Sequence, residues 1–174
     1  MSTTFKPLYS AGSAAYTISP ENIATSATFV AGVESSVYSN TSHLDEDVLV
    51  SGLWTSGTTP TANTTVQCWC VPPLSDDTAG TRVWPDVFDG TANAETVTSA
   101  GVLATLGQIV GAMQVDSATS NRGYWSAPTS IAERFGWVLP PSHVLFVAHN
   151  TAVNSNATTG NHAWYALRIQ RQGV

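Results

Sequence analysis

The chain has 174 residues, of which 43% are hydrophobic and 10% are charged, and its formal net charge at pH 7 is −6. This length and apolar content predict one domain with its own hydrophobic core and argue against a disordered chain. The basic residues are scattered along the sequence, so we expect no nucleic-acid binding through phosphate contacts: Lys6, Arg82, Arg122, Arg134, Arg168 and Arg171.

Residues 1–27 predict an extended N-terminal arm that is rich in small and hydroxyl residues. A purely flexible tail has no need of large apolar side chains, so we expect those of the arm to bind a partner protein: Phe5, Tyr9, Tyr16 and Ile18. Ser19 and Pro20 have the residue types of a helix cap and a first helical position, which predicts a short helical turn. The N-terminus lacks the pattern of a signal peptide, and no apolar run of ~20 residues occurs, so we expect synthesis in a cytosol and no membrane insertion.

Residues 28–174 predict a single domain of short strands. The first strand candidate lies within 28–39, with a bulge expected at Gly32. The segments 45–54 and 64–71 predict two strands of a hairpin with a long connection. Cys68 and Cys70 fall on one face of the second strand, about 6.5–7 Å apart between Cα atoms, which is at or beyond the limit of disulfide geometry. We expect two buried, reduced thiols there.

The segment 74–90 is a loop that contains Asp76, Asp77, Asp86 and Asp89. Their spacing does not match the alternating acids of an EF-hand, and Asp-Asp and Asp-Gly are common turn sequences, so the loop predicts turns rather than a calcium site. We expect three apolar residues to pin this loop to the domain: Trp84, Val87 and Phe88.

The next segments alternate between strands and one helix. Residues 99–106 fit a short helix or a strand, and we favour a strand or mixed segment, whereas 108–115 is a clear strand and Tyr124 begins another. A short helix is expected near 129–135, because Ser130 and Glu133 have the spacing of a capping box and Gly136 follows the helix.

The last third of the chain predicts a hairpin of two strands, 143–150 and 161–170, joined by a polar loop. In the second strand we expect the apolar side chains of odd number to face the core: Ala163, Tyr165, Leu167 and Ile169. Many short strands with frequent turns and little helix predict an all-β fold, an antiparallel β-sandwich or jelly-roll-like domain.

The residues predict neither an enzyme nor a cofactor or metal site. His143 and His149 are about 20 Å apart on one strand, too far to share a metal, and a pairing of His149 with His162 across the hairpin lacks a carboxylate. No Walker loop, dinucleotide fingerprint, His-Glu-x-x-His or Gly-x-Ser-x-Gly motif occurs in the sequence. The alternative from another class is a carbohydrate-binding module or glycosidase, in which tryptophans stack on sugars: Trp54, Trp69, Trp84, Trp125, Trp137 and Trp164.

The order of several segments resembles that of small virion structural proteins of tailed bacteriophages and prophages. These segments are Ala31-Gly-Val-Glu-Ser-Ser, Asp47-Val-Leu-Val-Ser-Gly, Gly57-Thr-Thr-Pro-Thr, Trp84-Pro-Asp-Val-Phe-Asp-Gly-Thr, Leu139-Pro-Pro, Phe146-Val-Ala-His-Asn-Thr and Asn156-Ala-Thr-Thr-Gly-Asn-His. The resemblance covers residues ~28–170 and is a pattern of strands and turns.

The resemblance implies a capsid decoration (cement) protein that is made in the bacterial host cytoplasm and lies on the capsid surface of the virion. Its partners would be the major capsid protein and further copies of itself, expected as a homotrimer. A surface rich in Ser and Thr and poor in charge fits this role, because it lowers the cost of desolvation on docking. A tail, baseplate or fibre component is the alternative within the same class.

Overall fold

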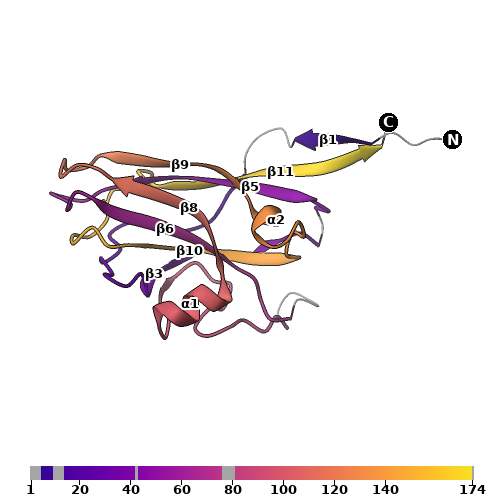
Figure 1. Cartoon of the computed structure of the whole chain (residues 1–174), viewed down its shortest axis with the longest axis horizontal. Coiled ribbons are helices and arrows are strands. Elements are labelled where there is room, and N and C mark those ends of the chain that lie inside the picture. The colour runs from indigo at the N-terminus through magenta and orange to yellow at the C-terminus, as the bar shows by residue number, and fades with distance from the viewer. Residues whose placement is uncertain (1–4, 10–13, 42, 76–80, 174) are drawn as a thin grey trace.

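The computed structural model describes residues 5–9, 14–41, 43–75 and 81–173. In chain order its elements are β1 (Phe5–Tyr9), β2 (Ala14–Ala15), β3 (Ala31–Glu34), β4 (Tyr38–Ser39), β5 (Asp47–Thr55), β6 (Thr64–Val71), β7 (Ala94–Thr96), α1 (Ala100–Leu106), β8 (Gln108–Val115), β9 (Gly123–Ser130), α2 (Ile131–Arg134), β10 (Ser142–His149) and β11 (Ala163–Gly173). The strands form two antiparallel sheets that pack face to face (Figure 1), which confirms the predicted all-β sandwich.

The two sheets are named here by their strand order. Sheet A has the order β1-β11-β5-β9, with β2 also paired to β11, and sheet B has the order β7-β3-β10-β6-β8, with β4 also paired to β10. Neighbouring strands are therefore mostly distant in sequence. The chain crosses repeatedly from one sheet to the other, so the fold is held together by long-range contacts rather than by local hairpins.

Strand β10 occupies the centre of sheet B and is buried along its whole length. Leu145 and Val147 face the core between the two sheets, which also contains the fully buried Trp54 and Trp164. The opposite face of β10 carries Phe146, which belongs to a second apolar cluster beneath α1 and the segment 81–99. In the described part of the chain, sheet B is thus covered on both faces and sheet A on one.

Both hairpins predicted from the sequence are wrong, although the strands themselves are present. β5 and β6 lie in different sheets, and so do β10 and β11. Each of these strands has one face with large apolar side chains, such as Trp54 on β5 and Trp164 on β11. These side chains bury more area when the strands face each other across the sandwich than when they lie side by side in one sheet.

The face of β11 that enters the core is also the opposite of the predicted one. Trp164 and Ala166 are buried, and the exposed fraction of Tyr165 is 41%. Trp164 and the neighbouring His162, which is also buried, direct this face inward because the indole is the largest side chain of the strand. The predicted core face, with Tyr165 and Leu167, lies on the outside of sheet A.

The described residues form two short helices where one was expected. Helix α2 confirms the predicted helix near 129–135, and the Ser130 side chain accepts a hydrogen bond from the Glu133 N–H as its cap. The segment predicted as a strand or mixed structure at 99–106 is helix α1. Its cap is Ser99, whose hydroxyl accepts the Val102 N–H, and this local bond favours the helix over a strand.

The described part of the N-terminal arm pairs with β11. Strand β1 covers the distal end of β11, from Ile169 to Gly173, and β2 pairs with Tyr165 and Ala166. The helical turn predicted at Ser19 is wrong; residues 16–20 have no regular secondary structure, and the chain turns at Glu21 and Asn22, which has a φ of 56°. Beyond the body of the sandwich, β1 and the end of β11 form a projecting two-stranded ribbon (Figure 1).

The bulge expected at Gly32 is absent, because β3 pairs in unbroken register with β7 and β10. Gly32 instead allows β3 to lie close to β10, because it has no side chain. A Cβ atom at this position would collide with the carbonyl oxygen of Val147 and lie 2.8 Å from the Phe146 ring. Register shifts occur elsewhere, between Val50 and Gly52 and between Cys68 and Trp69.

We expect Gly32→Ala to lower the free energy of unfolding by more than about 2 kcal/mol, because the added methyl group meets backbone that cannot move without breaking the sheet. The matched control is Gly101→Ala in α1, where the nearest heavy atom is Ser99 Oγ at 3.8 Å. Helix propensity predicts that this control raises stability by about 0.5–1 kcal/mol. Urea denaturation of both variants measures the two changes, and equal effects would contradict the packing argument.

Candidate interaction surface

The four residues predicted to bind a partner lie in different surroundings. Tyr9 is on β1 with an exposed fraction of 57%, and the side chain of Phe5 lies outside the described part of the structure. Tyr16 is buried in the main core, where its hydroxyl is 2.8 Å from His143 Nε2, and Ile18 packs against the same core. Within the described arm, Tyr9 is therefore exposed, whereas Tyr16 fastens the arm to its own domain.

The outer face of sheet A carries apolar side chains that no other part of the described chain covers. The register of the strands sets them side by side: Ile169 opposite Tyr9, Leu167 opposite Leu49, and Leu53 opposite both Ala163 and Trp125. Tyr165 lies between these pairs, opposite Ser51. We call this set of residues on β1, β5, β9 and β11 the outer face of sheet A.

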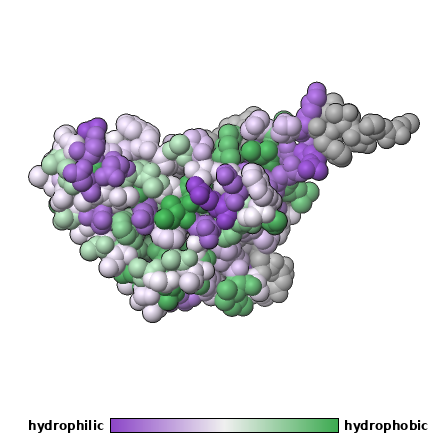
Figure 2. Space-filling view, viewed as in Figure 1, coloured by the Kyte–Doolittle hydropathy of each residue, from purple (hydrophilic) through white to green (hydrophobic). Residues whose placement is uncertain are grey.

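A shallow hollow of about 410 Å³ lies in this face. It is lined by Leu49, Ser51, Pro128, Tyr165 and Leu167, and none of these side chains carries a charge at neutral pH. In Figure 2 hydrophobic residues lie at the upper margin near the base of the ribbon, where sheet A lies in Figure 1, and hydrophilic residues lie at the left end of the same margin. Contiguous exposed apolar groups with a polar surround are typical of protein–protein contacts.

The structure separates the tryptophans that were considered as sugar platforms. Trp54 and Trp164 are fully buried, and Trp69 and Trp84 pack against the cluster beneath α1. Only Trp125 and Trp137 are largely exposed among the six, at 72% and 78%. Trp125 belongs to the outer face of sheet A, whereas Trp137 follows helix α2.

Three of the four histidines, His143, His149 and His162, are buried, whereas His43 is exposed. His149 contacts the Ile23 carbonyl oxygen through Nε2 at 3.1 Å and Thr151 Oγ1 through Nδ1 at 3.0 Å. His162 contacts the Asn156 carbonyl oxygen at 2.9 Å. Both rings pack against Trp54, so His149 and His162 do approach one another, across the sandwich rather than along a hairpin.

Burial sets the charge state of these histidines. It lowers the pKa of His143 to about 3 and that of His149 to about 4, and it also lowers the pKa of His162. The rings are therefore neutral at pH 7 and act as polar packing groups. The two cysteines are buried as predicted, and burial raises the pKa of both Cys68 and Cys70.

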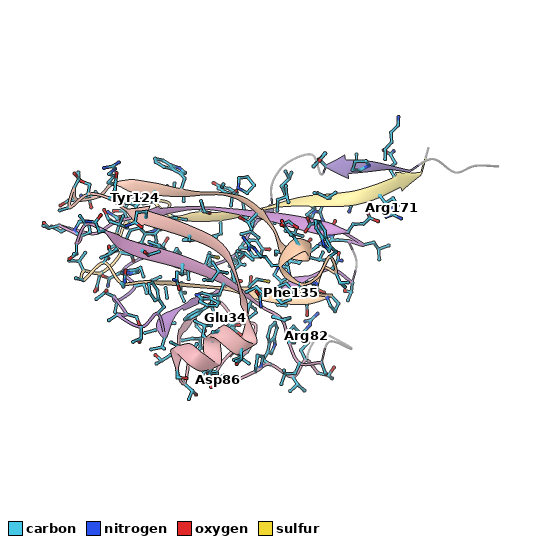
Figure 3. The ribbon with its side chains drawn as sticks, in the orientation of Figure 1. Glu34, Arg82, Asp86, Tyr124, Phe135 and Arg171 are labelled. Atoms are coloured by element: carbon cyan, nitrogen blue, oxygen red, sulfur yellow. The ribbon has the colours of Figure 1, made fainter. Side chains whose placement is uncertain are left out.

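Three carboxylates gather beside strand β3. Oxygens of Glu34, Asp89 and Glu95 lie within 4.8 Å of one another, and no other group of three acids, histidines or cysteines does so in the described part of the chain. Both oxygens of the fully buried Glu34 are already used, since they accept the N–H groups of Asp89 and Gly90 at 3.3 and 2.7 Å. The Glu34 carboxylate thus anchors the segment 81–99 to sheet B (Figure 3).

The aspartates of the segment 74–90 act as turn residues where they are described. Asp86 accepts hydrogen bonds from the N–H and hydroxyl of Thr98, and Asp89 accepts the N–H of Thr91. Asp76 and Asp77 lie outside the described residues. Phe88 is buried and Trp84 packs against the same apolar cluster beneath α1, so these two residues hold the loop to the domain as predicted, whereas Val87 is exposed.

Sequence reasoning did not find the outer face of sheet A, because it assigned Tyr165 and Leu167 to the core. A signal was present in β5, where apolar residues occupy both faces: Val48 and Val50 are buried, and Leu49 lies outside. A strand in a two-layer sandwich normally alternates apolar and polar residues, so apolar residues on both faces indicate a second buried surface.

No protein-family model, curated protein or solved structure matches this chain. The role as a phage virion protein, which the resemblance of these segments implies, therefore stays an expectation. Among the described residues, no helix has the length and apolar character needed to cross a membrane.

We expect the stability of the protein to depend on pH through Glu34, because burial raises the pKa of its carboxyl group from 4.5 to about 7. Between these two pKa values the folded state binds more protons than the unfolded state. The stabilisation that protonated Glu34 contributes is therefore complete below pH 4.5 and is lost as pH rises through 7. Glu34→Gln imitates the protonated acid. Its stability relative to the wild type should rise by about 2–3 kcal/mol between pH 5 and pH 8.

Urea denaturation of both proteins at the two pH values measures this change, and the subtraction cancels the effect of the histidines, which both proteins share. Glu133→Gln is the control, since Glu133 is exposed. A difference that stays constant from pH 5 to pH 8 would contradict the assignment to Glu34.

Proposed function

We propose that the chain is a structural protein of a bacteriophage virion, a capsid decoration protein that binds across neighbouring major capsid protein subunits and stabilises the head. The observation that carries the proposal is the outer face of sheet A, with its uncharged hollow between Leu49, Pro128, Tyr165 and Leu167. The resemblance of the strand and turn segments to virion proteins supports the same class.

The chemistry of this face suits docking on a large protein surface. Binding removes water from Trp125, Tyr165 and the leucines beside them without stripping water from an ion. Apolar burial contributes about 25 cal/mol per Å², and aromatic residues are enriched at the centres of such contacts. The flat shape of a sheet is suited to a broad partner such as a shell of packed subunits.

The interior supports a role in binding rather than in catalysis. The histidine side chains inside the sandwich are neutral and pack against Trp54 or Tyr38. The Tyr38 hydroxyl donates to the buried Asp45 carboxylate, so this acid is also part of the packing. These are the side chains that general acid–base chemistry uses, and here they stabilise the fold.

Stabilisation of the head would follow from mass action. A protein that binds the assembled shell and not its separated subunits stabilises the shell by RT ln(1 + [L]/Kd) for each site. At a free concentration of 100 times Kd this is about 2.7 kcal/mol per site. Repeated over a symmetric shell, such a modest contribution at each site becomes large for the whole particle.

The copy number per particle separates the head from the tail. Quantitative mass spectrometry of purified virions should find this chain in hundreds of copies, as expected of a protein repeated over the capsid. A few copies per particle would indicate the alternative, a tail, baseplate or fibre component. Absence from virions would contradict both.

Trp125 gives a specific reason to test carbohydrate binding as a second function. Its indole is 72% exposed, and an exposed indole is a platform for a sugar ring. A titration of tryptophan fluorescence with oligosaccharides, repeated with Trp125→Ser, detects such binding. A saturable change that disappears in the variant would favour a carbohydrate-binding module over a capsid protein.

We expect the double variant Trp125→Ser, Leu167→Asn to bind capsids at least tenfold more weakly than the wild type, because it removes apolar area from the centre of the docking face. Both side chains lie outside the core, so the fold should be retained. Val87→Ser is the matched control, since Val87 is exposed on the layer that covers sheet B. Cosedimentation with capsids stripped of this chain measures the binding.

Equal binding by the double variant and the wild type would contradict the role of the outer face. The structure also restricts a deletion test of the arm. Removal of residues 2–18 would delete Tyr16 from the core, whereas removal of residues 2–9 takes away β1 alone. The shorter deletion tests whether the arm contributes to docking without disturbing the fold.

A further inference from the structure

Five of the six basic residues lie at the end of the sandwich from which the ribbon projects, together with the acids Asp45, Glu46, Asp47 and Glu133. The paired residues of the ribbon, 5–9 and 169–173, include no acid. Lys6 and Arg171 lie on the ribbon itself, on β1 and β11, and Arg168 precedes it on β11. Arg134 ends helix α2, which is bound to the first residue of β5, and Arg82 donates a hydrogen bond to Ser39 of β4, the strand that pairs with the start of β10. The sixth basic residue, Arg122, lies over the ring of Tyr124, which is labelled at the opposite end of the molecule from Arg171 in Figure 3.

Negative charge gathers at another edge of the molecule, along β3 and β7. Glu34, Asp89 and Glu95 form the carboxylate group described above, and Glu21 lies on the segment that runs past β3. None of the residues that line this edge is a lysine or an arginine. Asp89 raises the pKa of both Glu34 and Glu95 as a secondary cause after burial, which indicates that these charges repel one another.

A cleft of about 350 Å³ opens at this acidic edge. Its apolar wall includes Ile23, Ala31 and Val33, and its acids are Glu21 and Glu95. An apolar wall beside carboxylates suits a long basic side chain, whose methylene groups pack while its charge meets the acids. We call it the acidic cleft. It adjoins β7, which is the terminal strand of sheet B.

The ribbon has the complementary properties. It consists of five residue pairs between β1 and β11 and extends beyond the body of the sandwich (Figure 1). Two strands alone are marginally stable in water. The ribbon exposes Leu8 and Tyr9, at 42% and 57%, next to the basic Lys6 and Arg171. Arg171 also forms an exposed ion pair with Glu46 at 2.6 Å.

We propose that the ribbon of one copy of this chain docks at the acidic cleft of a second copy. Lys6 of β1 meets Glu21 and Glu95, and Leu8, which lies on the same face of the strand as Lys6, contacts the apolar wall. In Figure 1 the ribbon projects at the upper right, and β3, which lines the acidic cleft, lies at the lower left. The ribbon of one copy therefore does not fill the cleft of the same copy. Such head-to-tail contacts join two different surfaces and generate a ring or an open chain.

This contact is separate from the outer face of sheet A and does not rest on the capsid role. It gives a physical basis for the self-association that the sequence led us to expect. A ring built in this way keeps the outer faces of its members free, and one ring then presents several docking faces at once. Multiple faces on one assembly strengthen attachment without any new contact.

The test is a charge exchange measured on the purified full chain in solution. Analytical ultracentrifugation of the wild type at low salt should show an oligomer that dissociates as salt is added, since salt screens exposed charges. Lys6→Glu and, separately, Glu95→Lys should each raise the dissociation constant about tenfold or more. The double variant Lys6→Glu, Glu95→Lys should restore the oligomer, because the charges are exchanged and complementary again.

Arg122→Glu is the matched control, because Arg122 is an exposed basic residue far from the ribbon, paired with Asp116. It should leave the oligomer unchanged, and circular dichroism checks that every variant is folded. The proposal is overturned if the wild type is monomeric at all concentrations, or if Lys6→Glu and Glu95→Lys leave the oligomer intact. A failure of capsid binding with the oligomer retained would overturn the proposed function and not this contact.

Discussion

The fold depends on strand β10, which is buried on both faces. One face packs into the core between the sheets through Leu145 and Val147, and the other packs beneath α1 through Phe146. A strand in this position needs cover from two layers, so the segment 81–99 and helix α1 are required parts of the structure. Buried Glu34 fixes this cover by accepting two N–H groups of the segment. Loss of either layer would expose a row of large apolar side chains.

The asymmetry between the sheets follows from the same constraint. Sheet B uses α1 and the segment 81–99 as its outer layer, whereas no described element covers the outer face of sheet A. That face nevertheless carries Leu49, Tyr165 and Leu167. The proposed partner surface is therefore where the sandwich lacks an outer layer, and docking would give sheet A the cover that sheet B already has.

Much of the fold could be predicted from the sequence, because strands of alternating residues and a capped helix are local patterns. The strand 45–54 and the cap formed by Ser130 are examples. The pairing of strands could not be predicted, since it depends on which faces meet across the sandwich. Trp164 illustrates the difficulty: alternation alone does not say which of two apolar faces is inside, and the larger indole decided it. The candidate surface was missed for the same reason, although it includes Tyr9, one of the arm residues predicted to bind a partner.

The two buried cysteines have a consequence for where the protein can remain folded. Cys68 and Cys70 lie next to one another on one face of β6, and burial keeps both thiols protonated. A thiol reacts with oxidants and disulfides through its thiolate, so these groups are chemically quiet in the folded protein. The folded protein has no disulfide bond between these two cysteines that could form or break when the surroundings change from reducing to oxidising. A chain that folds in one redox environment can thus serve in the other without a change in structure.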